Sequence, residues 1–400
     1  MRTEVAVVGG GPAGLITARE LAAQGIRVKV FEEHPKIGTP NHCAGVLSIE
    51  GLNRIGVEPN IDFLRHEIKG GTAFAPNGTG IRIMGRKTRA YIVDRTVFDK
   101  HLADAARDAG AEIETKHRIR DFIITNGKVV GVRGDLEIEA SIVIDAEGVS
   151  GALAKKVRLH KPESGILAGI NANVPGAQLE SDMVEVWLGK KLAEGMFAWA
   201  VPNGEDEIRC GLATSKGDAL ELLRSFIKAR FGLSKCEEPT RWPVLTGGPI
   251  DKTHGEGILL VGDVAGHTKP TTGGGVILGG MCAIIAAETA IQALEEGDYS
   301  ASFLRRYDKR WREALGGEFS SMLRMRRFLN SIPDPRMNKI FASVKSAGLE
   351  PILEKFIAEG DMDLQSEFLR KALTHPGMLR VLTGTVGHLA LEEFKSRFNL

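Results

Sequence analysis

The chain has 400 residues, 48 of them glycine, and a formal net charge of +1. This length exceeds what one small hydrophobic core organises, so two or three folding units are expected. The balanced charge provides no global field that would attract nucleic acid, and no nucleic-acid partner is expected.

Four cysteines stand at positions 43, 210, 236 and 282, far apart and without a C-x-x-C pair. This spacing argues against a metal site or a disulfide framework and favours a reduced, intracellular setting. Met1-Arg2-Thr3 leads directly into an apolar run, so no secretory signal is expected and the predicted location is the cytoplasm.

The N-terminal segment predicts a dinucleotide site. Residues 4–8 are an apolar run that meets the turn Gly9-x-Gly11-x-x-Gly14, and a helical pattern and a second apolar run follow, ending at Glu32. Gly9 would permit the turn, Gly11 would let a pyrophosphate approach the backbone, and Gly14 would let helix and strand pack together. Glu32 could accept hydrogen bonds from ribose hydroxyls. The alternative is a turn without a ligand, and this segment alone does not separate NAD from FAD.

Residues 35–48 have no periodicity but carry His42, Cys43 and Gly45 close together. Loops after strand ends hold the sites of doubly wound folds, so this loop is expected beside a cofactor ring or a substrate. The alternative for Cys43 is a small buried residue. Its only evident base is His42, so no nucleophile is predicted.

A sheet outside the first unit is expected from the loose alternation of residues 67–83. A helix is then expected from Arg95 to Gly110. A cation at a helix N-terminus is electrostatically unfavourable, so Arg95 is interpreted as a phosphate or cofactor contact, with a solvated arginine as the alternative.

Several short strands are expected next, joined in part by a hairpin turn at Asn126-Gly127. The last of them runs into Asp145-Ala-Glu147-Gly148, an acid-glycine pattern that predicts a cofactor-facing strand end. The expected strands are 111–114, 121–125, 129–133, 136–139 and 141–145.

A second sheet is predicted between residues 165 and 214, followed by an amphipathic helix at 220–231. Phe197, Trp199 and Val201 alternate along one strand and would share one face. They indicate either packing in a sheet core or the aromatic wall of a substrate cavity. The expected strands are 165–174, 183–188, 196–201 and 208–213.

A buried strand at 257–261 ends in Gly262-Asp263, and a loop with Gly273, Gly274 and Gly275 then opens a long apolar helix. Asp263 could hold a ribityl or ribose hydroxyl. The glycine amides at the helix start would suit a negatively charged ring edge. The apolar stretch contains five glycines and Glu288, so a buried helix is favoured over a membrane span.

Beyond Asp298 the chain is expected to be helical, with prolines at 333, 335, 351 and 376 dividing it into short helices. The segment 320–330 interleaves apolar residues with Arg324, Arg326 and Arg327. A packing helix with solvated arginines is favoured over a helix on a membrane surface.

Three of these motifs occur in the order of the three fingerprints of the para-hydroxybenzoate-hydroxylase-like FAD oxidoreductases. They are Gly9-x-Gly11-x-x-Gly14, Asp145-Ala-Glu147-Gly148 and Gly262-Asp263, within a resemblance that spans about residues 1–300. The resemblance implies FAD as the cofactor. Glu147 departs from it, because the middle fingerprint usually has aspartate.

Within that superfamily the chain resembles the geranylgeranyl reductase family. The similar segments are His42-Cys43-Ala44-Gly45, Tyr91-Ile-Val-Asp-Arg95, Phe197-Ala-Trp199-Ala-Val201-Pro202, and Gly262 to Gly275. The third resembles an aromatic-x-Trp-x-Phe-Pro motif in which Phe197 replaces the usual Tyr and Val201 the usual Phe. The family implies hydride transfer from reduced flavin, plus protonation, to double bonds of geranylgeranyl chains in archaeal-type membrane lipid precursors.

The predicted fold class is α/β (α+β overall). A discontinuous Rossmann-like FAD-binding domain is expected at 1–65, 90–160 and 246–300. An inserted antiparallel-sheet substrate domain is expected at 66–89 and 161–245, and a helical C-terminal region at 301–400.

The residues expected to bind FAD are Gly9, Gly11, Ala13, Gly14, Glu32, Glu33, Cys43, Ala44, Gly45, Arg95, Glu147, Gly148, Asp263, Gly273, Gly274, Gly275 and Val276. Those expected at the reaction are His42, Cys43, Phe197 and Trp199, with His42, Cys43 or water as the proton donor. The expected partners are a prenylated glycerolipid and an external electron donor, either NAD(P)H or a ferredoxin-like protein. A lipid substrate also implies peripheral contact with the inner face of the cell membrane.

Three other functions stay open. An aromatic monooxygenase would need NAD(P)H and a polar pocket for a phenol. A flavin halogenase is suggested because Phe197-x-Trp199-x-Val201-Pro202 also resembles Trp-x-Trp-x-Ile-Pro, although the first Trp is missing. An electron-transfer flavoprotein serving a quinone would need an iron–sulfur cluster or a partner, and the cysteine spacing excludes the usual cluster motifs.

Overall fold

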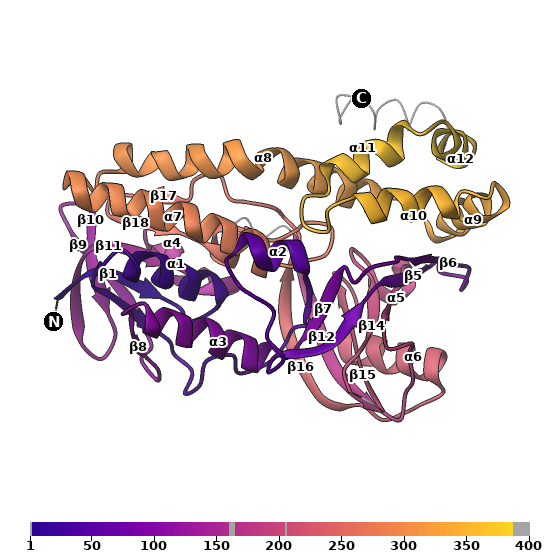
Figure 1. Cartoon of the computed structure of the whole chain (residues 1–400), viewed down its shortest axis with the longest axis horizontal. Coiled ribbons are helices and arrows are strands. Elements are labelled where there is room, and N and C mark those ends of the chain that lie inside the picture. Colours follow the sequence, from indigo (N-terminus) through magenta and orange to yellow (C-terminus); the bar gives the residue numbers. More distant parts are fainter. Residues whose placement is uncertain (1, 160–164, 205, 387–400) are drawn as a thin grey trace.

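The structure is a computed structural model that describes residues 2–159, 165–204 and 206–386. It is a mixed α/β fold, as predicted, with one large sheet at each end and a layer of long helices above them (Figure 1). A small three-stranded sheet, β3-β7-β4, joins the chain segments between the large sheets. The division into three domains stays a prediction.

The first large sheet contains eight strands in the order β17-β18-β11-β1-β2-β8, with the β9–β10 hairpin attached to β11. Its centre is parallel. Alternate residues of β1 face opposite sides. Val5 and Val7 pack with α1 (Pro12–Ala22), α7 (Val276–Glu296) and α8 (Ala301–Ser331). Ala6 and Val8 pack with the β9–β10 hairpin and α4 (Ala152–Lys156). The strands are β1 (Arg2–Val8), β2 (Val28–Phe31), β8 (Glu112–Glu114), β9 (Asp121–Thr125), β10 (Lys128–Arg133), β11 (Glu137–Asp145), β17 (His254–Gly255) and β18 (Ile258–Leu260).

One boundary prediction in this sheet is wrong. Residues 136–139 and 141–145 were expected as two strands, but they form the single strand β11. Its first residues pair with β10, while β1 pairs with it from Glu139 through Asp145. The pairing with β10 and the pairing with β1 overlap at Glu139, so the strand continues through Ala140 without a break.

The second large sheet has the order β16-β12-β15-β14-β13-β5-β6, and α6 (Ala219–Phe231) packs on one of its faces. The four strands expected between 165 and 214 are present. The strand β16 was not among the expected strands. It contains Pro239 and Pro243 and lies at the sheet edge, where prolines are tolerated. The strands are β5 (Gly70–Phe74), β6 (Gly80–Met84), β12 (Ile166–Pro175), β13 (Met183–Trp187), β14 (Ala198–Pro202), β15 (Glu207–Thr214) and β16 (Glu237–Leu245).

The small sheet and the short elements connect these layers. The strands are β3 (Val46–Ser48), β4 (Leu64–Ile68) and β7 (Ala90–Val93), and the short helices are α2 (Ile49–Arg54), α4 (Ala152–Lys156), α5 (Lys190–Ala193) and the 3-10 turns at Gly148–Ser150 and Gly262–Ala265. The longer helices of the first half are α1 (Pro12–Ala22) and α3 (Arg95–Asp108). The α1, α2, α3 and α7 helices share one apolar cluster.

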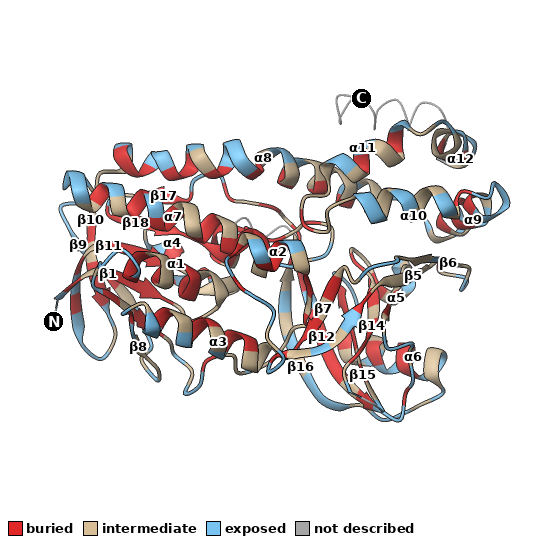
Figure 2. Cartoon of the chain, viewed as in Figure 1, coloured by how far each residue is buried: buried red, intermediate tan, exposed pale blue. Residues whose placement is uncertain are grey.

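The helix α7 (Val276–Glu296) is long and apolar enough to cross a membrane by length and composition, and 61% of its most apolar window is buried in the fold. Eleven of its residues are buried, and they pack against α1, β1 and α8, as predicted for a buried helix. Figure 2 shows buried and intermediate residues along α7, whereas exposed residues recur along the outer side of α8.

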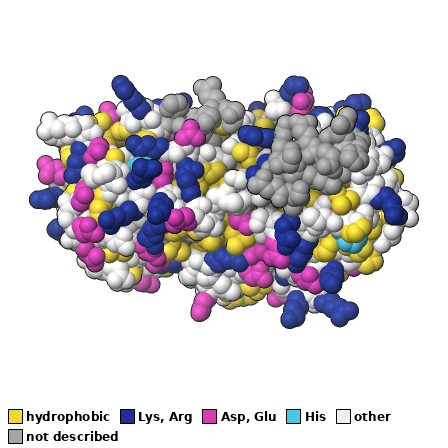
Figure 3. Space-filling view, turned by 90° about the horizontal axis from the view of Figure 1, so that it is seen from above, with side chains coloured by type: hydrophobic (Ala, Val, Ile, Leu, Met, Phe, Trp, Pro, Cys, Tyr) yellow, Lys and Arg dark blue, Asp and Glu magenta, His cyan; other side chains and the backbone are white. Residues whose placement is uncertain are grey.

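Five helices complete the described chain: α8 (Ala301–Ser331), α9 (Asp334–Ser346), α10 (Glu350–Glu359), α11 (Ser366–Thr374) and α12 (Pro376–Val386). The helices α9, α10 and α12 begin at or beside prolines that were expected to divide this region. The α8 helix runs from the first sheet toward the second, and the later helices lie on the side of β5 and β6 (Figure 1), where α9 packs on Ala75 and Ile81. Seen from above (Figure 3), positive and negative side chains are interspersed over this face.

Candidate cofactor and substrate site

A cavity of about 1040 Å³ lies between the two large sheets. Its walls come from the ends of β1, β2 and β11, the start of α7, the face of β12, β13 and β14, and residues 357–368. The structure brings together every predicted site residue except Gly45, which is absent from the lining. Those residues are Gly9, Gly11, Ala13, Gly14, Glu32, Glu33, His42, Cys43, Ala44, Arg95, Glu147, Gly148, Phe197, Trp199, Asp263, Gly273, Gly274, Gly275 and Val276.

The glycine turn has the geometry that a phosphate site needs. Gly9 has φ +105°, in the region that favours glycine. A Cβ on Gly14 would lie 2.1 Å from the carbonyl oxygen of Gly9, so only glycine lets α1 approach the turn. A Cβ on Gly11 would meet nothing within 4 Å, so this backbone faces open space in the cavity. The residues therefore fit the diphosphate of a dinucleotide, with the N-terminus of α1 beside it.

Glu32 lies at the end of β2 with its side chain 12% exposed. One carboxylate oxygen accepts from the backbone N–H of Gly10 at 2.8 Å, and the other accepts from the N–H of His34 at 2.8 Å. The second oxygen also lies 2.5 Å from Nδ1 of His34. The oxygen bonded to Gly10 keeps a second lone pair, so the fixed carboxylate can still accept from a ribose hydroxyl. Its neighbour Glu33 forms an ion pair with Arg118 at 3.3 Å.

The middle motif is held together by its own acids. Glu147 accepts hydrogen bonds from the backbone N–H groups of Leu153 and Ala154, both at 2.9 Å, and from the hydroxyl of Ser150 at 2.8 Å. Asp145 is fully buried, and burial, followed by the nearby Glu147, holds its pKa well above the usual range. The Glu147 carboxylate thus fixes the turn before α4. Gly148 lines the cavity, and because it has no side chain its backbone is exposed to a ligand there.

The third motif brings an acid to the start of α7. Gly262 has φ +71°, and a Cβ there would lie 2.8 Å from Cβ of Ala13 in α1. A Cβ on Gly275 would lie 2.6 Å from Oδ1 of Asp263, so glycine permits this approach. Gly275 caps α7 without a side-chain hydrogen bond, which leaves the first amides of the helix for a ligand.

The loop of His42 and Cys43 is attached to the second sheet. The amide of Asn171 on β12 donates to the His42 carbonyl at 2.6 Å, and Arg209 on β15 donates to the Cys43 carbonyl at 2.9 Å. The His42 ring stacks on Trp242 with ring centroids 3.8 Å apart. The loop therefore closes one side of the cavity in a fixed position.

Arg95 is not solvated, and part of its guanidinium is already engaged by another side chain, so the whole group is not free to bind a phosphate. Its side chain is 11% exposed and forms a two-fold hydrogen-bonded ion pair with Asp99, at 2.8 and 2.9 Å. Burial disfavours the charge of Arg95, but Asp99 and the adjacent Cys43 outweigh burial and raise its pKa. The pair with Asp99, one turn along α3, explains how a cation is tolerated at a helix start.

His42 is expected to be neutral at pH 7. Burial, and then the charge of Arg95, lower its pKa from 6.5 to about 4, while its Nδ1 lies 3.0 Å from the Pro40 carbonyl. An unfolded chain would protonate this ring near pH 6.5, so its contribution to stability is present above that pH and is lost as the pH falls toward 4. An NMR titration, with His42→Gln to assign the signal, should show no protonation of His42 at pH 6; a midpoint near 6.5 would contradict this.

Phe197 and Trp199 form part of the cavity wall and also pack with their own sheet, so both interpretations of this strand describe part of their environment. Their ring centroids lie 6.0 Å apart at 78°. The Trp199 indole donates to Asn171 at 3.0 Å, which satisfies its polar atom and leaves the ring as an apolar surface. Val184, Val186 and Met362 extend this apolar wall.

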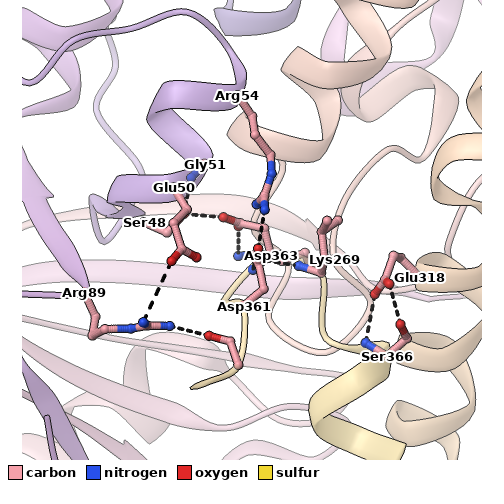
Figure 4. A network of polar contacts seen from close by, with 12 residues as sticks. Ser48, Glu50, Gly51, Arg54, Arg89, Lys269, Glu318, Asp361, Asp363 and Ser366 are labelled. Carbon is pink, nitrogen blue, oxygen red and sulfur yellow. Dashed lines mark hydrogen bonds and ion pairs between the residues drawn. The ribbon is translucent and has the colours of Figure 1, made fainter. Parts of the chain in front are cut away.

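No sequence pattern indicated that the segment 360–366 belongs to the cavity. Asp361, Met362 and Asp363 line it, together with Lys269 and Ser48 (Figure 4). Asp363 is 1% exposed; its carboxylate pairs with the Lys269 ammonium at 2.7 Å and accepts from the Ser48 hydroxyl.

Further contacts fasten both ends of this segment. Arg54 of α2 pairs with Asp361, Arg89 donates to the Gly360 carbonyl, and Glu318 of α8 accepts from the backbone N–H of Ser366 at 2.8 Å. These partners are tens to hundreds of positions apart, so no local pattern indicates them. We call Lys269, Asp363 and Ser48 the latch.

Comparison with known proteins identifies the class. The family described as FAD binding domain matches residues 2–315. A digeranylgeranylglycerophospholipid reductase of Methanothermobacter thermautotrophicus is 32% identical over 395 residues, which cover 96% of this chain and 99% of the relative. One of Methanothrix thermoacetophila is 32% identical over 86% of this chain and 92% of the relative.

The solved structures agree on the fold. A geranylgeranyl bacteriochlorophyll reductase-like protein of Thermoplasma acidophilum superposes with a TM-score of 0.84 at 23% identity, covering 99% of both chains. A flavin-dependent brominase superposes with a TM-score of 0.71 at 16% identity and covers 99% of this chain.

The chain therefore belongs to the FAD-binding oxidoreductases, in the family of the digeranylgeranylglycerophospholipid reductases. The predicted resemblance, the FAD cofactor and the assignment to the oxidoreductases are confirmed. The roles of the individual site residues stay predictions.

Proposed function

We propose that this enzyme saturates carbon–carbon double bonds in the geranylgeranyl chains of an archaeal-type membrane lipid precursor. The observation that carries the proposal is the cavity itself, which runs from the glycine turn to an apolar wall of Trp199, Phe197 and Val184. A prenyl chain has no polar groups, so it needs such a wall and no paired acid and base. The names of the curated relatives support the same substrate class.

We propose that the glycine turn and Glu32 hold the ADP part of FAD, and that Asp263 and the amides of Gly274 and Gly275 hold the part next to the ring. The Gly273 amide already donates to the Lys269 carbonyl at 2.7 Å. FAD supplies the hydride when it is bound and reduced. The amides at the start of α7 favour negative charge at the adjoining ring edge. Trp199 and Phe197 orient the alkene and exclude water. Because His42 is held neutral, we assign the second hydrogen to Cys43 or water rather than to an imidazolium.

The direct test is anaerobic reduction of the purified flavoprotein followed by addition of a digeranylgeranyl glycerophospholipid. Reoxidation of the flavin should accompany a mass gain of two hydrogens for each double bond. Reoxidation only after oxygen is admitted, with a hydroxylated or halogenated product, would overturn the proposal in favour of a monooxygenase or halogenase. Reoxidation only by a quinone would favour an electron-transfer flavoprotein.

We further propose that the electron donor visits transiently, because the sequence contains a single dinucleotide turn and FAD is assigned to it. NAD(P)H and a reduced ferredoxin can be compared by the rate at which each bleaches the flavin. We also propose a cytoplasmic enzyme that contacts the inner membrane face to collect its lipid. A protein that stays wholly unbound in liposome flotation would contradict this contact.

A further inference from the structure

Arg326 is a buried cation that no carboxylate accompanies among the residues the structure describes. It lies on α8 and is 4% exposed, although its segment was expected to carry solvated arginines. Its guanidinium donates to the carbonyls of Pro270 at 2.9 Å, Gly195 at 3.2 Å and Thr271, and it lies 2.9 Å from the sulfur of Met196. All four acceptors are neutral, and no carboxylate of the described residues forms an ion pair with it.

This arrangement satisfies hydrogen bonds but leaves a full charge in the interior. Burial lowers the pKa of Arg326 to about 10, so the guanidinium is still protonated at pH 7. A buried charge is costly unless a counter-charge accompanies it. Carbonyl dipoles compensate only in part, so the site favours any ligand that brings negative charge close by.

The position of Arg326 shows where that charge would be. Pro270 and Thr271 directly precede Thr272 and Gly273 in the cavity lining, and Gly195 and Met196 directly precede Phe197. The guanidinium carbon lies 5.9 Å from the centre of the Phe197 ring. Arg326 therefore sits one layer behind the wall, beneath two of the segments proposed to surround the reacting end of the cofactor.

We propose that Arg326 is a positioning residue whose charge stabilises the negative charge that the flavin ring acquires on reduction. This rests on the flavin orientation in the proposed function. Two electrons and one proton, taken from the external donor, leave one negative charge on the ring. Arg326 acts through the backbone of residues 270–273. Its hydrogen bonds hold this glycine loop in place, and its charge favours the reduced over the oxidised cofactor.

The test compares three holoenzyme variants: Arg326→Met, Arg326→Lys and the control Arg327→Met, which removes a neighbouring, exposed arginine of the same helix. The reduction potential is measured by anaerobic equilibration with redox dyes, without any lipid. Arg326→Met should lower the ratio of reduced to oxidised flavin at a given potential at least tenfold, about 30 mV for a two-electron couple. Arg327→Met should not change the potential.

Arg326→Lys separates charge from shape, because lysine keeps the charge but cannot reach all four acceptors. It should keep a potential close to that of the unmodified enzyme while the protein unfolds at a lower temperature. A folded, FAD-bound Arg326→Met with an unchanged potential would overturn the proposal. If Arg326→Met does not fold, the Arg326→Lys variant is the deciding one. A tenfold lower ratio of reduced to oxidised flavin in Arg326→Lys, which keeps the charge, would also overturn the proposal. Because no alkene is present, these results are independent of whether the enzyme reduces geranylgeranyl lipids.

Discussion

Gly11→Ala is expected to abolish FAD binding in a protein that still folds, whereas Gly14→Ala is expected to damage the fold itself. The Cβ added at Gly11 meets no protein atom within 4 Å and projects into the space proposed for the diphosphate. The Cβ added at Gly14 would lie 2.1 Å from the Gly9 oxygen, so α1 must move away from the turn. Overpacking of this kind costs about 1–3 kcal/mol or more in unfolding free energy.

Both effects can be measured by titrating apoprotein with FAD and by thermal unfolding in the absence of FAD. Gly317→Ala is the matched control, since Gly317 is exposed within α8 and its added Cβ also meets nothing. It should leave FAD affinity unchanged and raise stability by up to about 1 kcal/mol. Normal FAD affinity in Gly11→Ala would show that the diphosphate does not approach this backbone.

Breaking the latch is expected to cost more than any surface change. Asp363→Ala removes the acceptor of Lys269, whose side chain is 14% exposed, and of Ser48. Removing one partner of a buried ion pair typically destabilises by about 3–5 kcal/mol, because the other charge stays buried without compensation. We therefore expect a lower denaturation midpoint and faster proteolysis after residue 360.

The double variant Lys269→Met/Asp363→Leu should recover part of the stability that Asp363→Ala loses, because no unpaired charge remains at this position. The control is Glu313→Gln, which breaks an exposed pair with Lys309 on α8 and should cost less than about 1 kcal/mol. Equal effects of Asp363→Ala and Glu313→Gln on the denaturation midpoint would contradict a buried latch.

The parts of this site that could be predicted are those that local backbone geometry dictates. A turn that needs φ +105° at Gly9 and contact at Gly14 requires glycine at fixed spacing, and this spacing is visible in the sequence. The same holds for Gly262 and Gly275 around Asp263. Such constraints involve residues close together in the chain, so three short motifs indicated one cavity.

The partners of individual charged side chains could not be predicted. Arg95 was expected at the cofactor because a cation at a helix N-terminus is unfavourable. Its ion pair with Asp99, one of several acids of the helix, was not foreseen. Arg326 was expected in solvent because its acceptors are backbone carbonyls more than 50 positions earlier. Glu147 was interpreted as a cofactor ligand, yet its carboxylate binds amides of its own turn. For Arg326, tertiary contacts, which leave no periodic pattern, determine the environment of the side chain. For Arg95 and Glu147, the choice among several nearby partners determines it.

The latch also has a consequence for how the enzyme is made. Chains are synthesised from the N-terminus, so the glycine turn and the start of α7 are made well before residues 357–368. Once the start of α7 has been made, the cofactor-binding groove is still open on the side that residues 357–368 later cover. Its last wall arrives only when Asp363 reaches Lys269 and Ser48. FAD can therefore enter from that open side, and the apolar space for the lipid closes after it.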